Sequence, residues 1–170
     1  MATLSVTNIF NLSKATLVKF GALDWIADAV ADAIANSESV GNRICGLYYL
    51  ESYCLQLKSG RVRGDIEPIV SQEKAGIVRV DAKFGFAQPA FQRGIVPARE
   101  AALKNGICSL AIGHAHTCTS LGYFTEQIAK SNLIGIGFTN ASPIVAAPGG
   151  KSRIIGTCLL YTSDAADERH

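Results

Sequence analysis

The chain has 170 residues, of which 48% are hydrophobic and 18% are charged, with 16 basic against 14 acidic residues and a formal net charge of +2. This composition is typical of a globular protein with a core and excludes an intrinsically disordered chain. The balanced charge, without a cluster of Lys and Arg, argues against a nucleic-acid partner.

Neither a membrane span nor a signal peptide is expected from the sequence. One long uncharged run, residues 131–150, contains Pro143, Pro148 and four glycines, so it would not hold a membrane-spanning helix. The N-terminus has no basic stretch before an apolar one, which argues against a signal peptide. Five cysteines are scattered without a CxxC motif, which favours reduced thiols in a cytoplasmic protein.

The first sixty residues predict three helices. Apolar residues at helical spacing end at Gly21, a helix stop signal, and resume at Leu23. The second helix is expected to break at residues 36–39, and a third helix is expected over residues 42–58. Residues 1–72 are therefore predicted to form a helical N-terminal unit.

After residue 61 the pattern changes to strands that alternate with helices. Short apolar or β-branched stretches predict three strands, over residues 76–82, 107–112 and 133–138. Two helical patterns separate them, over residues 88–104 and 120–130, and the first of these ends at Asn105-Gly106. This alternation predicts an α/β fold with some parallel strand pairing.

The last thirteen residues differ from the rest of the chain. Residues 158–168 are similar to the in-frame translation of a transposase adapter used in sequencing libraries, and the alternative is an ordinary polar tail. We expect the natural sequence to stop near Thr157 and residues 158–170 to be an adapter-derived tail. No fold or function is inferred from them.

Polar residues cluster where the second predicted strand gives way to a helix, in Gly113-His-Ala-His-Thr-Cys-Thr-Ser120. Such a junction is a usual place for a ligand site, because helix N-terminal amides point towards anions. If the segment is extended, His114, His116 and Cys118 share one face and provide three zinc ligands. Two other interpretations stay open: polar residues that only satisfy a helix start, and a loop that binds substrate or cofactor.

Two further motifs carry weaker signals. Cys45 on the third helix has the chemistry of a nucleophile or an acid, but an isolated helical Cys is more often a small buried apolar residue. The segment Pro148-Gly-Gly-Lys-Ser152 lacks the spacing of a phosphate-binding loop and is expected to be a turn. No GxGxxG motif is present, so no Rossmann-type fingerprint is assigned.

Five motifs occur in order along the chain: Val80-Asp-Ala-Lys-Phe-Gly-Phe-Ala-Gln-Pro89, Leu121-Gly-Tyr123, Gly135-Ile-Gly-Phe-Thr-Asn-Ala-Ser-Pro143, Ala146-Ala-Pro-Gly-Gly-Lys151 and Gly156-Thr157. Together they resemble the malate/L-lactate dehydrogenase family, whose nucleotide domain is not a Rossmann fold. The family includes ureidoglycolate and sulfolactate dehydrogenases and Δ1-piperideine-2-carboxylate reductases. The resemblance covers residues 4–157. Because members are about twice this long, it implies an N-terminal half, with residues 73–157 as part of an α/β NAD(P)-binding domain.

The resemblance implies a reversible hydride transfer between NAD or NADP and C2 of a 2-oxo or 2-hydroxy acid, or of a cyclic imino acid. In the family, a Ser-His-Gly motif supplies the proton donor, and an Arg four residues after the His grips the substrate carboxylate. Here Ile44, Cys45 and Tyr49 stand at the Ser, the His and the Arg. Arg43 is two residues before Cys45, so it faces elsewhere on a helix and is an unsuitable substitute for the clamp. This departure allows a changed substrate, a donor recruited from elsewhere, for which we expect His116, or a loss of activity.

The resemblance also assigns the nucleotide contacts, to Thr117, Cys118, Thr119, Ser120 and Leu121. It assigns a substrate contact to Thr157. The whole enzyme is expected to be a cytoplasmic homodimer with a small-molecule substrate, whereas the fragment alone is expected to be inactive.

Two alternatives stay open. One is a metal-binding or noncatalytic binding module built on His114, His116 and Cys118. The other is an inactive paralogue, which Cys45 and Tyr49 suggest.

Overall fold

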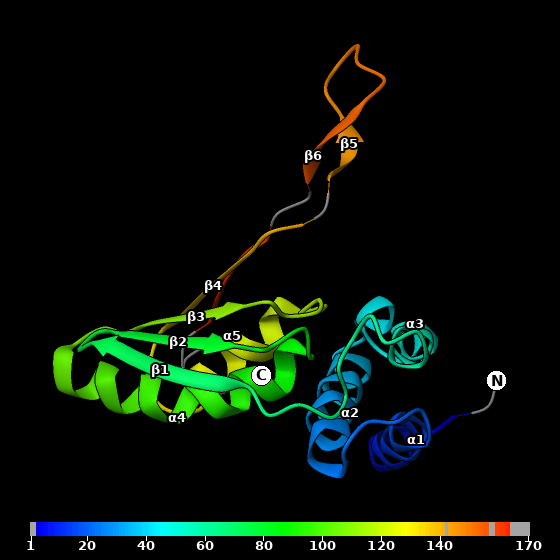
Figure 1. Cartoon of the computed structure of the whole chain (residues 1–170), viewed down its shortest axis with the longest axis horizontal. Helices are drawn as coiled ribbons and strands as arrows, with labels where there is room; N and C mark the ends of the chain where they lie inside the picture. The colour runs from blue at the N-terminus through cyan, green and yellow to red at the C-terminus, as the bar shows by residue number, and fades with distance from the viewer. Residues whose placement is uncertain (1–2, 142, 157–158, 164–170) are drawn as a thin grey trace. The chain divides into compact units, whose positions relative to one another are not determined.

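The computed structural model describes residues 3–141, 143–156 and 159–163 (Figure 1). The chain divides into two compact units, Met1–Ser120 and Leu121–His170. None of the described helices is long and apolar enough to cross a membrane.

Helices α1 (Val6–Lys19), α2 (Asp24–Ser39) and α3 (Leu47–Lys58) open the first unit, and a 3-10 turn, η1 (Arg43–Cys45), precedes α3. The Ser5 side chain caps α1 by accepting a hydrogen bond from the Asn8 amide at 3.1 Å. The helices share one core, in which four large side chains are at most 1% exposed: Leu17, Ile26, Ile34 and Tyr53. The predicted helical start of the chain is therefore confirmed.

Two helix boundaries differ from those predicted. Helix α2 continues through residues 36–39, because Ser37 lies on its buried face and the Ser39 hydroxyl donates to the Asn36 carbonyl at 2.7 Å. The third predicted helix is divided at Gly46. The Glu38 carboxylate caps α3 there, accepting a hydrogen bond from the Leu47 amide at 2.8 Å.

A three-stranded sheet follows, in the order β1 (Ile69–Lys74), β2 (Ile77–Asp81) and β3 (Ser109–Gly113). Strands β1 and β2 are antiparallel, whereas β2 and β3 are parallel and are joined by helix α4 (Ala87–Asn105). The predicted parallel pairing is confirmed, as is the predicted helix stop, where Gly106 has φ +81°. The sequence pattern does not predict β1, because its exposed, polar segment lacks apolar alternation.

Helix α4 covers one face of this sheet (Figure 1). Val78 and Val80 are buried, and Ala90 of α4 packs in the same cluster as Val80. Gly94 allows this close packing, since a Cβ there would lie 2.6 Å from Val80 Cγ2 and 2.7 Å from Leu110 Cδ1. The neighbouring positions on the strands point to the opposite face, where the sheet carries polar side chains.

The second unit begins with helix α5 (Leu121–Ala129). Strand β4 (Gly135–Thr139) pairs antiparallel with β7 (Leu159–Ser163), and β5 (Pro143–Ala146) pairs antiparallel with β6 (Arg153–Gly156). Helix α5 and strand β4 lie where the sequence predicts them, and residues 148–152 lie between β5 and β6, outside any helix or strand. The mixed α/β fold is confirmed. Strand β7 falls within residues 158–170, whose adapter origin stays a prediction.

Candidate functional site

Cys45 ends the short η1 turn, directly before the buried Gly46 at which α3 begins. Its side chain is half-buried. Burial raises the pKa of the Cys45 thiol; a hydrogen bond with Asn42 opposes this, and the neighbouring Cys118 adds to it. The thiol therefore keeps its proton at neutral pH, where it is able to act as a weak acid.

Tyr49 lies on the first turn of α3 and is half-buried. Its ring is 5.9 Å from that of Tyr48 and 6.0 Å from that of Tyr53, between ring centroids. A tyrosine hydroxyl donates one hydrogen bond but carries no positive charge. Arg43, the nearest cation along the chain, is exposed on η1.

His116 lies against two buried aromatic rings. Its ring meets those of Tyr53 and Phe86 edge-on, with centroids 5.9 Å apart in both cases. The His116 backbone amide donates to the Gly85 carbonyl at 2.8 Å, which holds the ring in this place. Burial, and next the charge of Arg61, lower the pKa of His116, so its imidazole is neutral at pH 7.

Within the described part of the chain, the Nδ1 atom of His116 is buried and has no hydrogen-bond partner. An unpaired ring nitrogen costs free energy unless a ligand or a solvent molecule pairs with it.

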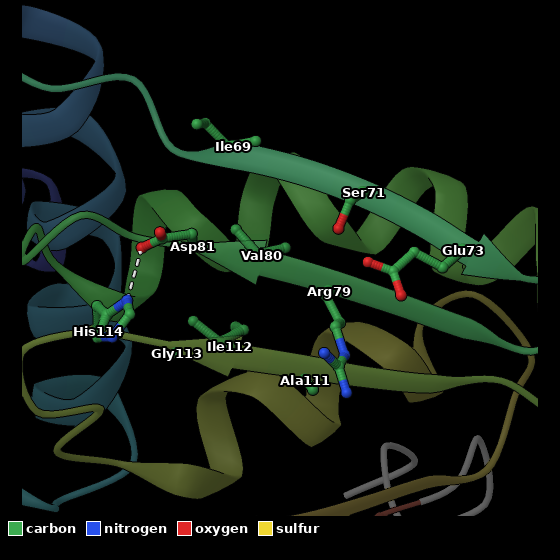
Figure 2. A pocket seen from close by; sticks show the side chains of 10 residues that line it. All are labelled: Ile69, Ser71, Glu73, Arg79, Val80, Asp81, Ala111, Ile112, Gly113 and His114. Carbon is green, nitrogen blue, oxygen red and sulfur yellow. Dashed lines mark hydrogen bonds and ion pairs between the residues drawn. The ribbon is translucent and has the colours of Figure 1, made fainter.

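His114 points elsewhere, so the interpretation that residues 114, 116 and 118 share one face is wrong. Strand β3 ends at Gly113 and His114 has φ +49°, which breaks the alternation of an extended strand. The His114 Nδ1 lies 3.1 Å from the Asp81 carboxylate (Figure 2). Among the residues that the structure describes, no group of His, Cys, Asp and Glu is arranged to hold a metal ion.

A shallow concavity of about 450 Å³ lies on the sheet face opposite α4. Figure 2 shows Ser71, Glu73 and Arg79 on its floor, with the Asp81–His114 pair at one end. Of the site residues predicted from the sequence, only His114 lines it. The concavity is therefore separate from the cluster around His116.

The predicted nucleotide segment leaves β3 as an irregular loop. Thr117 is exposed, whereas Cys118, Thr119 and Ser120 are half-buried. The Thr119 side chain accepts a hydrogen bond from the Tyr53 hydroxyl at 3.1 Å. Leu121 is buried at the start of α5, in the second unit. Thr157 lies outside the described residues.

Tyr53 contacts three of the predicted site residues, because its ring lies beside those of Tyr49 and His116 and its hydroxyl donates to Thr119. Burial is the main cause that raises the pKa of its hydroxyl, and smaller contributions come from Cys45, Tyr49 and Cys118. The sequence does not single out Tyr53, since it is one of three tyrosines beside an apolar helix face. Its place beside that apolar face is the signal in the sequence, and the structure shows that Tyr53 is 1% exposed.

Comparison with known proteins places this geometry in context. The family model described as malate/L-lactate dehydrogenase matches residues 4–160. The (2R)-3-sulfolactate dehydrogenase (NADP(+)) of Chromohalobacter salexigens is 35% identical over 155 residues, which are 91% of this chain and 46% of that protein. The Δ1-pyrroline-2-carboxylate/Δ1-piperideine-2-carboxylate reductase of Pseudomonas syringae pv. tomato is 30% identical over 91% of this chain and 45% of its own length.

Solved structures of similar proteins have the same fold. Δ1-piperideine-2-carboxylate reductase from Pseudomonas syringae superposes with a TM-score of 0.87 at 27% identity, over 96% of this chain and 49% of that chain. Malate dehydrogenase from Pyrococcus horikoshii superposes with a TM-score of 0.88 at 26% identity, over 96% and 47%. The chain thus spans about half the length of the relatives that it matches.

Proposed function

Since the chain belongs to the malate/L-lactate dehydrogenase family, we propose that the protein is an NAD(P)-dependent oxidoreductase. Its substrate class is a 2-oxo or 2-hydroxy acid, or a cyclic imino acid. The gathering of Cys45, His116 and the 117–120 loop around Tyr53 carries the proposal, because a weak acid, a neutral base and a cofactor loop then lie in one unit. The names of the relatives support the same chemistry.

The nucleotide is assigned to Thr117, Cys118, Thr119, Ser120 and Leu121. The loop follows the carboxyl end of a parallel strand, where α/β proteins bind nucleotides. The exposed Thr117 is a polar residue that suits such a ligand. When bound, NAD(P)H supplies the hydride.

Proton transfer is assigned to Cys45 and His116. The protonated Cys45 thiol gives a proton to the oxygen or nitrogen that receives charge when C2 is reduced. The resulting Cys45 thiolate takes the same proton back in the reverse direction, and His116, which is neutral at pH 7, is assigned to exchange that proton with solvent. Because the two groups have pKa values shifted in opposite directions, neither has to change charge before the reaction begins.

Substrate binding is assigned to Tyr49 and Thr157. The Tyr49 hydroxyl offers one neutral hydrogen bond to the carboxylate, where a guanidinium would offer two and a positive charge. The exposed Arg43 does not replace it. We therefore expect weaker binding of the carboxylate than an Arg provides.

Turnover is proposed for the full-length protein, and the 170-residue chain alone is expected to be inactive. The test is a screen of the full-length protein with NADH and NADPH against 2-oxo acids and Δ1-pyrroline-2-carboxylate, and with NAD+ and NADP+ against 3-sulfolactate. Cys45→Ala is expected to lower turnover roughly 10²- to 10⁴-fold, the usual share of general acid catalysis. Cys108→Ala, at a half-buried Cys outside the site, is the matched control. An unchanged rate in Cys45→Ala excludes the donor role, and no turnover with any substrate favours an inactive paralogue.

The assembly and the compartment belong to the same proposal. We expect a cytoplasmic homodimer, on the pattern of the family. Sedimentation equilibrium of the full-length protein measures its mass, and a monomer at micromolar concentration would contradict the expectation.

A further inference from the structure

The loop after β3 has a conformation that its own residues do not favour. Thr119 has φ +55°, in the left-handed region that a β-branched residue rarely adopts. Such a backbone persists only where surrounding groups hold it. The contacts of Thr119 therefore identify the groups that fix the shape of this loop.

Three hydrogen bonds meet at Thr119. The Tyr53 hydroxyl donates to Thr119 Oγ1 at 3.1 Å, and this oxygen donates in turn to the Cys118 carbonyl at 2.7 Å. The Thr119 amide donates to Thr117 Oγ1 at 3.2 Å. Of these bonds, only the one from Tyr53 comes from outside the loop.

A second side chain reaches the loop from α4. Gln88 is 1% exposed, and its Nε2 donates to the Cys118 carbonyl at 3.3 Å. Within the described residues, its Oε1 is buried and has no hydrogen-bond partner. A buried amide with only its NH2 group hydrogen-bonded stabilises the fold poorly. We therefore expect Gln88 to matter for the position of the Cys118 carbonyl that it binds.

The Tyr53 hydroxyl is likewise not needed for packing. The ring packs against Phe86 and His116, as a phenylalanine ring would. Because burial raises the pKa of Tyr53, its hydroxyl stays protonated and stays a donor at physiological pH.

We propose that Tyr53 and Gln88 are positioning residues that set the shape of the 117–120 loop for the nucleotide. The inference rests on the proposed function for its ligand. Tyr53 also lies on α3, the helix that begins directly after Cys45 and Gly46. One side chain therefore connects the proton-donor segment with the cofactor loop.

The test compares Tyr53→Phe with Tyr48→Phe, a control at an exposed tyrosine of the same helix. The readouts are amide hydrogen exchange at residues 117–120 of the 170-residue chain and the affinity of the full-length protein for NADPH and NADH from fluorescence titration. In Tyr53→Phe we expect exchange in the loop to become roughly 3- to 10-fold faster, which corresponds to one lost hydrogen bond. The control is expected to exchange as the unmodified chain does.

A double-mutant cycle separates positioning from general loosening. Thr119→Val removes the same hydrogen bond from its other end, so Tyr53→Phe/Thr119→Val is expected to be no worse than the more affected single variant. Additive effects would overturn the proposal, as would unchanged loop exchange in Tyr53→Phe. Gln88→Leu, which removes the half-satisfied amide, is expected to speed loop exchange without lowering the unfolding temperature.

The nucleotide titration separates the cofactor assignment from the positioning role of Tyr53 and Gln88. If the unmodified full-length protein binds NADPH or NADH, Tyr53→Phe is expected to bind that nucleotide several-fold more weakly, and equal affinity would overturn the positioning role. If the unmodified full-length protein binds neither nucleotide, the cofactor assignment fails. The exchange data then still decide whether Tyr53 and Gln88 fix the loop.

Discussion

Glu38 is expected to stabilise the junction that carries Cys45. Its carboxylate accepts the Leu47 amide at 2.8 Å, at a helix start where the N-cap residue, Gly46, has no side chain to offer. Losing a cap costs about 0.5–2 kcal/mol, and losing a negative charge near a helix N-terminus costs about 0.3–1 kcal/mol more. We therefore expect Glu38→Ala to lose about 1–3 kcal/mol of unfolding free energy. In a chain of this size that lowers the unfolding temperature by roughly 2–12 °C.

A substitution at Gly46 tests the position of the Glu38 side chain in a second way. A Cβ on residue 46 would lie 2.3 Å from Glu38 Oε1, so Gly46→Ala is expected to destabilise the unmodified chain. In the Glu38→Ala background that contact is gone, and the cost of Gly46→Ala should fall. Urea unfolding of the four chains measures the coupling, with Glu51→Ala, at an exposed carboxylate of α3, as the control. The reasoning is refuted if Glu38→Ala is no more destabilising than Glu51→Ala, or if Gly46→Ala costs the same in both backgrounds.

Three further outcomes are expected. Peptide-level alkylation of Cys45 should be slow at pH 7 and should accelerate only above the usual thiol range, because burial raises its pKa; rapid labelling at pH 7 would contradict this. NMR titration should place the pKa of His116 below 6.5. The free energy of unfolding should then fall as the pH drops from 6.5 to the pKa of the folded state, and His116→Gln should weaken this dependence of stability on pH. Gly94→Ala should cost about 1–3 kcal/mol in urea unfolding, because the clash with Val80 and Leu110 outweighs a helix-propensity gain of about 1 kcal/mol; a more stable variant would show that α4 is able to shift.

The parts of the fold that local patterns determine were predictable from the sequence. The helix that ends at Gly106 has clear periodicity and a glycine in the left-handed region, so both its type and its end are predicted. The parallel strands on either side of it follow from their apolar, β-branched composition. In these segments, local preference and tertiary packing agree.

The rest depends on contacts between distant residues. Gly46 divides the predicted third helix because Glu38, eight residues earlier on another helix, caps the new start. Residues 114 and 116 separate because a single residue, His114, has a positive φ, and periodicity does not reveal this. The role of Tyr53 depends on a hydrogen bond to a residue 66 positions away. No local pattern contains these contacts.

The departures from the family motif affect charge more than proton supply. With Cys45 protonated and His116 neutral, the site keeps a weak acid and a base at pH 7 without a net charge from either. Tyr49, in contrast, stands where the resemblance implies an Arg, so the positive charge implied for the substrate carboxylate is missing at this position. On the proposed assignment the reaction therefore keeps its proton donor but loses much of its affinity for the acid. Tyr49→Arg in the full-length protein is expected to lower KM more than it changes kcat, whereas a loss of affinity on adding the Arg would show that the carboxylate binds elsewhere.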